Sequence, residues 1–300
     1  MGLNIVGAAM SFMKNDIVMH ADMPQLGIGK VLEHAMGDKV RIFFLTVGEK
    51  KFDTNFAKLV KVEGDQAHHP LLDNLKIPER GKKIEYRRME ELIQAFLEMA
   101  PDGFQDTQYQ EKFRTKKVEL HRQIVEWFEK ERLQSQLAEK KFSEICQEAL
   151  EAVDKINLIA PTEKKVLKAA LSEESNQAKF DKKLYALLYQ DVDLRLRFNQ
   201  FATCLHRIEA AKWTIQTFFL FMVYPDKYLF MKPTTTRNAA AAFSFDLKYK
   251  KDLNWRSYRN LLAFGKYVAD ELEKVGGNLQ PQDMIDVQSF MWSVAQGRLV

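Results

Sequence analysis

Hydrophobic and polar residues alternate in short runs near the start of the chain, as they do in half-buried β-strands. Between residues 14 and 62 these runs are rich in β-branched and aromatic residues and are separated by Gly, Asp or Asn. Gly37 and Asp38 stand between two of them, where a hairpin turn is expected. So many short strands in so short a segment predict a small, strongly bent barrel. The runs cover residues 16–21, 27–35, 38–47, 50–53 and 57–62.

The pattern changes after residue 65. Residues 66–84 contain two prolines and show no clear period, which is typical of a linker. From residue 85 onward, apolar residues recur at spacings of three and four, as in amphipathic helices. We therefore expect an α+β protein with an SH3-like β-barrel at 14–65, a linker at 66–84 and a mainly α-helical domain at 85–300.

The helical pattern is interrupted at Pro101–Gly103 and again at Pro161, and Thr162 is the expected N-cap of the next helix. The most apolar run, residues 213–224, is much shorter than the roughly 20 residues of a membrane helix, so it predicts a buried helix. The other helices are expected at 85–100, 109–159, 176–189, 191–205, 207–223, 254–275 and 281–297.

Composition agrees with a globular protein, because 46% of the residues are hydrophobic and 29% are charged. Cys146 and Cys204 lie far apart and form no CxxC motif, so they predict buried free thiols in a reducing cytoplasm. The apolar first residues follow no basic segment, and we expect no secretion signal. We also expect no cofactor and no association with a membrane.

The first predicted strands resemble a known family of small barrels. "DIVMHADMPQLGIGKVLE" followed by "VRIFF" is similar to the opening of SH3-like or Tudor-like barrels in bacterial proteins, among them the RNA-polymerase-interacting domains of CarD-type regulators. The resemblance implies a barrel that contacts a protein partner. Gly27 and Gly29 would allow a sharp turn and a close approach of two strands. The shared residues are Asp16, Val18, His20, Gly27, Ile28, Gly29 and Val31.

Motifs that would identify an enzyme are scarce. The chain contains no GxxxxGK[ST], GxGxxG, HExxH or GxSxG motif, and His68 and His69 are the only adjacent histidines, in the predicted linker, so we expect no metal site. One pattern resembles the PD-(D/E)xK signature of metal-dependent nucleases. In it, Asp226 and Asp246 would hold Mg²⁺ and Lys248 would stabilise the developing charge.

Positive charge is concentrated near the end of the chain. Residues 14–65 contain eight basic and eight acidic residues, whereas residues 225–260 contain eight basic and three acidic ones in a chain of net charge +4. Aromatic residues alternate with these bases, which suits a phosphate backbone and unstacked nucleobases. The aromatic residues are Tyr228, Phe243, Phe245, Tyr249, Trp255 and Tyr258.

The segment "YLFMKPTTTRNAAAAF" predicts a helix over "RNAAAAF" that begins at its threonines, because Pro233 cannot stand inside a helix. Thr234, Thr235 or Thr236 is a ready N-cap, and the free N–H groups of a helix start carry about half a positive charge. Cations beside such a start can bind a phosphate group. The expected phosphate or nucleic-acid site comprises Lys232, Thr235, Thr236, Arg237, Arg256 and Arg259.

An alternative leaves no site there. Asp283 and Asp286 could instead pair with Lys232, Arg237 or Arg256 inside the protein and serve only helix packing. The patterns K-P-T-x-T-R, N-W-R-x-Y and D-M-I-D-V-Q-S-F resemble uncharacterised bacterial proteins, a resemblance that implies a fold but no activity. We thus expect a non-enzymatic adaptor of bacterial nucleic-acid metabolism. The alternatives are the nuclease and a purely protein-binding scaffold.

Overall fold

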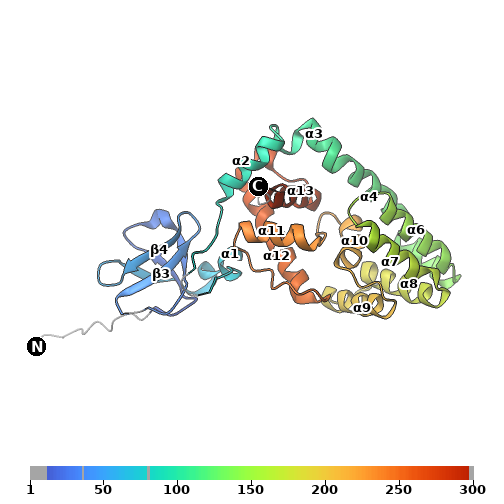
Figure 1. The fold of residues 1–300 in the computed structure, drawn as a ribbon, viewed down its shortest axis with the longest axis horizontal. Coiled ribbons are helices and arrows are strands. Elements are labelled where there is room, and N and C mark those ends of the chain that lie inside the picture. Colours follow the sequence, from blue (N-terminus) through green and yellow to red (C-terminus); the bar gives the residue numbers. More distant parts are fainter. Residues whose placement is uncertain (1–11, 36, 80–81, 297–300) are drawn as a thin grey trace, which may run out of the picture. The chain divides into compact units, whose positions relative to one another are not determined.

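The chain folds into two compact units. The computed structural model describes residues 12–35, 37–79 and 82–296. One unit contains the chain up to Arg88 together with Phe243–Phe245, and the other contains Met89–Ala242 and the chain from Asp246 onward (Figure 1). The first unit carries all the strands found in the described residues, and the second is helical. The expected α+β class is confirmed.

A five-stranded antiparallel sheet forms the first unit, with the strand order β4-β3-β2-β1-β5. Four of the five predicted apolar runs each contain one of these strands, and the run at 50–53 covers the second part of β4. Gly37 adopts a positive φ of 59° in the turn between β2 and β3. The pairing of β1 with β5 brings the two ends of the β segment together. The strands are β1 (Ile17–His20), β2 (Ile28–Val31), β3 (Lys39–Phe44), β4 (Gly48–Asp53) and β5 (Leu59–Lys61).

Both faces of this sheet are covered by apolar side chains. One face curls around a core that includes Val18, Ile42 and Phe44. The other face presents Leu32 and Phe43, which pack against Leu72. A sheet buried on both faces requires a covering layer that the strands themselves do not supply, and this layer comes from the segment that follows β5.

That covering segment is the predicted linker. It contains the short helix α1 (Pro70–Asp73), whose Leu71 and Leu72 are fully buried, and Lys30 on β2 donates a hydrogen bond to the Leu72 carbonyl at 2.7 Å. Leu75 then forms a β-bridge with Phe245, which belongs to the same unit. The described part of residues 66–84 is therefore a packed layer of the first unit, because its leucines are more stable against the sheet than in water.

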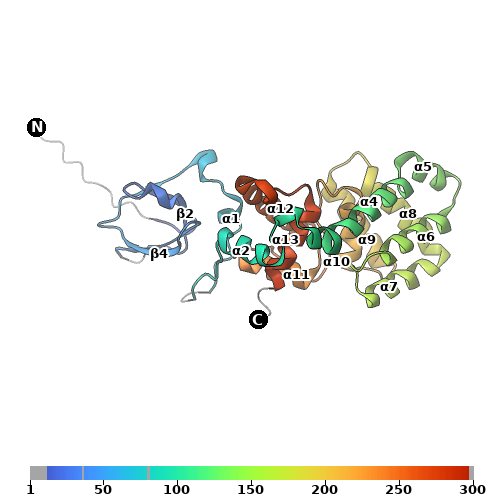
Figure 2. The same ribbon diagram turned by 90° about the horizontal axis from the view of Figure 1, so that it is seen from above.

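The second unit is a layered array of helices (Figure 2). Helix α10 is buried along its whole length and packs against α4, α8 and α9, which confirms the buried helix predicted from the most apolar run. The C-terminal helices α12 and α13 pack against each other, and α13 also packs on α11 and α2. The bounds of the first helices are α2 (Met89–Met99), α3 (Thr107–Tyr109), a π-helical turn (Gln110–Arg114), α4 (Thr115–Trp127), α5 (Lys130–Ala138), α6 (Phe142–Asp154) and α7 (Pro161–Ser172). The remaining ones are α8 (Glu174–Tyr189), α9 (Leu194–Arg207), α10 (Trp213–Val223), α11 (Pro233–Ala242), α12 (Trp255–Val275) and α13 (Met284–Gln296).

Two local predictions about this unit were wrong. The single long helix expected over 109–159 is divided, because the chain turns at Phe128 and again at Lys140, where φ is 60°. The expected N-cap Thr162 lies inside α7, since Pro161 already occupies the first helical position and Ala160 precedes it. In both places the periodicity located the helices and misplaced their ends.

A carboxyl group is buried in the helical core. Asp181 on α8 is 1% exposed, and the Cys146 thiol donates to its Oδ1 at 3.2 Å, while Oδ2 has no hydrogen-bond partner. Burial raises the pKa of Asp181 to about 8, so this side chain is mostly protonated at neutral pH. Cys146 and Cys204 are both buried free thiols, as expected.

In the described part of the chain, no helix has the length and apolar character required to cross a membrane.

We predict that Gly29→Ala destabilises the first unit by about 1–3 kcal/mol, because the new methyl group would lie 2.7 Å from the side chains of Ile42 and Phe44. Gly27 has a φ of 70°, so the two glycines have the roles that the sequence suggested: a turn and a close approach. Urea unfolding followed by circular dichroism measures the effect. Lys39→Ala, at an exposed strand position, is the control, and an unchanged midpoint for Gly29→Ala would contradict the packing described.

We predict that Asp181→Asn stabilises the protein at pH 8 by roughly 1–3 kcal/mol and has a smaller effect at pH 5. The folded-state pKa of Asp181 is raised, so its contribution to stability is present at low pH and is lost as the pH rises from about 4 to about 8. Thermal unfolding at several pH values tests this. Asp252→Asn, at an exposed carboxylate, should leave the pH profile unchanged. If the difference in stability between Asp181→Asn and wild type were the same at every pH, the prediction would be contradicted.

Candidate functional site

Five lysines surround one cavity of the second unit. Lys112, Lys116 and Lys117 come from the π-helical turn and α4, Lys155 from the end of α6, and Lys232 from the residue before α11. The cavity measures about 360 Å³, and no carboxylate lines it among the described residues. The remaining lining residues are Phe113, Ile156, Asn157, Leu158, Phe230, Thr235, Gln288, Ser289 and Trp292.

The five lysines differ in how far their charge is compensated. Lys155 forms an ion pair with Glu151 at 3.0 Å, and Lys112 donates to the Gln108 side chain at 3.3 Å. Lys116 and Lys232 are exposed and make no ion pair within the described ranges 12–35, 37–79 and 82–296. These two side chains are therefore the cations most available to an anionic ligand.

Lys117 is the most buried of the five lysines. Its Nζ donates to the Phe113 carbonyl in the preceding turn. Burial lowers the pKa of Lys117 to about 8, while the carboxylates of Asp286 and Asp283 act in the opposite direction and the Arg114 cation adds to the lowering. A bound anion would favour the charged form of this amine, so ligand affinity and protonation of Lys117 are linked.

Helix α13 contributes Gln288, Ser289 and Trp292 to the wall of the cavity. Gln288 is 6% exposed and its Oε1 has no hydrogen-bond partner. Trp292, one turn later, is half-buried, and its ring lies 5.1 Å from that of Phe113. Ser289 donates its hydroxyl hydrogen to the Ile285 carbonyl at 2.8 Å. The wall thus combines an aromatic surface with a carboxamide that the protein leaves unsatisfied.

A buried ion-pair network holds this wall in place. Arg114 donates to Asp286 at 2.9 Å and to both oxygens of Asp283 at 2.8 Å, and the Tyr109 hydroxyl donates to Asp286 at 2.6 Å. Burial raises the pKa of Asp286 despite the hydrogen bond from Tyr109 and the charge of Arg114. Burial lowers the pKa of Arg114, but its bonds to Asp283 and the charge of Asp286 raise it overall. The network joins the segment bearing Lys112 and Lys116 to the start of α13.

The helix expected at "KPTTTRNAAAAF" is present, but it begins at Pro233, before the threonines that were expected to cap it. Pro233 is the first residue of α11, and the Lys232 carbonyl accepts the first helical hydrogen bond from Thr236 at 2.8 Å. The threonines lie in the first turn and none of them is the N-cap. Lys232 and Thr235 line the cavity, whereas Thr236 is fully buried and its Oγ1 has no partner.

The three arginines of the predicted site do not line this cavity. Arg237, Arg256 and Arg259 are exposed, and the Arg237 guanidinium lies over the Tyr249 ring at 5.2 Å. The aromatic residues between the bases are largely core: Phe243, Phe245 and Tyr258 are at most 2% exposed. Spacing along the chain could not show that the helix faces of α11 and α12 separate these cations from the pocket.

The alternative in which acidic residues neutralise the site is not what the structure shows. Asp283 and Asp286 both pair with Arg114. Lys232, Arg237 and Arg256 therefore keep their charge free of these two carboxylates. The partner of both aspartates is Arg114, which donates to them from 169 and 172 residues away in sequence, so proximity along the chain did not suggest it.

The residues of the nuclease pattern lie outside helices and strands. Asp226 is exposed and pairs with Lys227 at 3.5 Å, while Asp246 and Lys248 bind each other. The pattern requires carboxylates on adjacent strands, and every strand among the described residues lies between Ile17 and Lys61. The described residues also contain no cluster of three His, Cys, Asp or Glu side chains suited to a metal ion.

Sequence reasoning missed four of the five lysines. Lys112, Lys116 and Lys117 belong to the run "KFRTKK", in which four of six residues are basic, and this local run was the available signal. Lys155 gives no such signal, since an acidic helix precedes it. Only the packing of α4, α6, α11 and α13 places these side chains around a common space.

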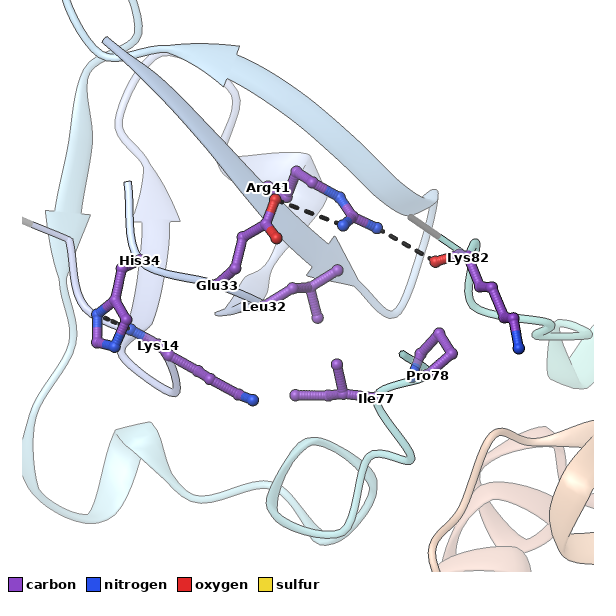
Figure 3. A pocket seen from close by; sticks show the side chains of 8 residues that line it. All are labelled: Lys14, Leu32, Glu33, His34, Arg41, Ile77, Pro78 and Lys82. Carbon is purple, nitrogen blue, oxygen red and sulfur yellow. Dashed lines mark hydrogen bonds and ion pairs between the residues drawn. The ribbon is translucent and has the colours of Figure 1, made fainter. Parts of the chain in front are cut away.

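Two further cavities lie within single units. In the first unit, Leu32, Ile77 and Pro78 face one another, while Arg41 is fixed by Glu33, Glu49 and the Lys82 carbonyl (Figure 3). Its volume is about 450 Å³. In the second unit, Lys179, Lys182, Lys183 and Arg207 line a basic cavity of about 420 Å³ between α8 and α9. The Lys183 amine there already donates to Gln200 at 2.9 Å.

Comparison with known proteins adds one finding. Residues 13–62 match a family model described as a protein of unknown function, DUF3553, and this match coincides with the five strands. No curated protein and no solved structure matches the chain. The helical unit with its lysine cavity lies outside the matched residues.

We predict that binding of a single-stranded oligonucleotide weakens between pH 7 and pH 9, because Lys117 loses its proton near pH 8 while phosphodiester charges stay constant. Fluorescence anisotropy at constant ionic strength measures the affinity. Lys117→Arg keeps the charge throughout this range and should abolish the decline. An equal loss of affinity between pH 7 and pH 9 in Lys117→Arg would show that another group causes the pH dependence.

Proposed function

We propose that this protein is a non-enzymatic adaptor whose helical unit binds a phosphate-bearing ligand, with nucleic acid as its source. The observation that carries the proposal is the cavity with five lysines and no carboxylate in its described lining. Anionic ligands gain affinity from such a site through charge attraction and counterion release. The barrel would contact a protein partner, and the chain would act in the cytoplasm of a bacterium.

The start of α11 supports phosphate binding at one end of the cavity. Its first N–H groups have no partner within the helix, and Lys232 and Thr235 stand beside them. Lysine amines are compact charges that can approach a phosphate from several directions. A phosphate group at this helix start would lie within reach of the exposed Lys116 and Lys232 cations.

The first unit supports a protein contact. Its residues 14–65 carry no net charge, which favours a protein surface over a polyanion. Met19 and Val60 are paired across β1 and β5 and are 40% and 50% exposed, and Phe56 before β5 is 84% exposed. Exposed apolar side chains of this kind mark contact surfaces. The resemblance to CarD-type polymerase-interacting barrels makes a subunit of the transcription machinery the first partner to test.

We predict that the double variant Lys116→Ala with Lys232→Ala weakens binding of a single-stranded oligonucleotide at least tenfold at low salt. In a plot of the logarithm of affinity against the logarithm of salt concentration, the slope should become shallower by about 1–2 units, because each lysine neutralises about one phosphate. Anisotropy titrations at four salt concentrations measure both quantities. Both side chains are exposed, so the fold should persist.

Matched controls separate the cavity from a general surface effect. Lys179→Ala with Lys182→Ala removes two exposed lysines from the other basic cavity and should change affinity little. Arg237→Ala with Arg256→Ala removes two cations outside the cavity and should also have a small effect. Equal losses in all three double variants would refute a localised site. Absence of binding by wild type would favour the protein scaffold, and Mg²⁺-dependent cleavage lost in Asp246→Ala would favour the nuclease.

A further inference from the structure

The lysine cavity has a second wall whose chemistry is different from that of a phosphate site. On α13, Gln288 and Trp292 are four residues apart and therefore lie on the same face of the helix. Both line the cavity together with the lysines of α4 and the start of α11. A ligand that fills the space would thus meet an aromatic ring and a carboxamide as well as cations.

The Gln288 side chain indicates that a polar group of a ligand binds beside it in the cavity. Its side chain is more than nine-tenths buried and its Oε1 has no hydrogen-bond partner. A buried acceptor left unsatisfied carries a desolvation penalty, so native proteins rarely retain one without a reason. A carboxamide offers one donor and one acceptor side by side, and a half-turn of the amide exchanges them. This pairing matches the donor–acceptor edge of adenine.

Trp292 supplies the complementary stacking surface. It is half-buried, and contact with Phe113 fixes its ring on one side, at 5.1 Å between ring centroids. An indole that is already held in place loses little conformational entropy when it stacks on a nucleobase, and such stacking contributes to the binding of each base. Phosphate alone would make no use of this ring.

We propose that the cavity holds one unpaired nucleotide, with its phosphate among the lysines, its base stacked on Trp292 and the base edge bonded by Gln288. This inference rests on the proposed phosphate-binding function and adds the nucleobase to it. A volume of about 360 Å³ admits a single nucleotide and excludes a base pair with its backbones. The ligand is therefore a single-stranded segment or a strand end.

The test compares three probes of equal length: single-stranded oligodeoxyadenylate, the same backbone with abasic sugars, and an oligodeoxyadenylate–oligothymidylate duplex with blunt ends. Wild type should bind the oligodeoxyadenylate at least about fivefold more tightly than the abasic strand. Trp292→Leu should bind both strands as wild type binds the abasic one. Gln288→Leu should lose part of the preference while keeping the same salt dependence.

The outcomes distinguish this inference from the function on which it rests. Equal affinity of wild type for the base-bearing and abasic strands would overturn the nucleotide assignment and leave phosphate binding intact. Preference for the duplex would also overturn it. Failure to bind any probe would reject the proposed function itself. Lys116→Ala with Lys232→Ala should weaken binding of both single strands alike, and thermal unfolding of each variant confirms that it is folded.

Discussion

The pairing of Arg114 with Asp283 and Asp286 is the interaction on which the candidate site depends. It joins the π-helical turn to the first turn of α13. The π-helical turn continues into α4, which bears Lys116 and Lys117, and α13 bears Gln288 and Trp292 further along. The pairing acts beside the direct contact between Phe113 and Trp292, which links the same two segments. Buried ion pairs contribute little net stability, but removing one partner leaves an uncompensated charge at a cost of about 3–5 kcal/mol. The network therefore selects one arrangement of these helices, while its net contribution to the free energy of unfolding is small.

This network also determines the electrostatics of the cavity. Arg114 engages the two carboxylates that stand closest in sequence to the pocket residues of α13, and Tyr109 and the Gln282 backbone N–H complete the bonds of Asp286. Lys116 and Lys232 have no ion-pair partner in the described part of the chain, and burial lowers the pKa of Lys117. A desolvated amine is less favourable in its charged form. An anion bound in the cavity would favour that charged form.

The surfaces of the two units differ in charge and in exposed apolar side chains. The barrel is neutral, its sheet is covered on both faces, and α1 with the residues after it provides the second cover. Its remaining exposed apolar side chains suit a protein partner. The helical unit has a long buried helix, α10, at its core and basic cavities near its surface. An adaptor that joins a protein to a nucleic acid would need both kinds of surface, and the matched family model covers only the first.

The sequence by itself determined the α+β class, the five strands, the roles of Gly27 and Gly29, the buried helix at 213–223 and the presence of a helix after Lys232, although not its first residue. These follow from local periodicity and backbone preference, which act over a few neighbouring residues. Only the tertiary structure decided that Leu72 and Leu75 cover the sheet and that Arg114 pairs with both aspartates. It also decided that Lys116 and Lys155 line the same cavity as Lys232, whereas Arg256 does not. These depend on which helix faces meet. Packing between segments more than a hundred residues apart leaves no periodic signal in the chain.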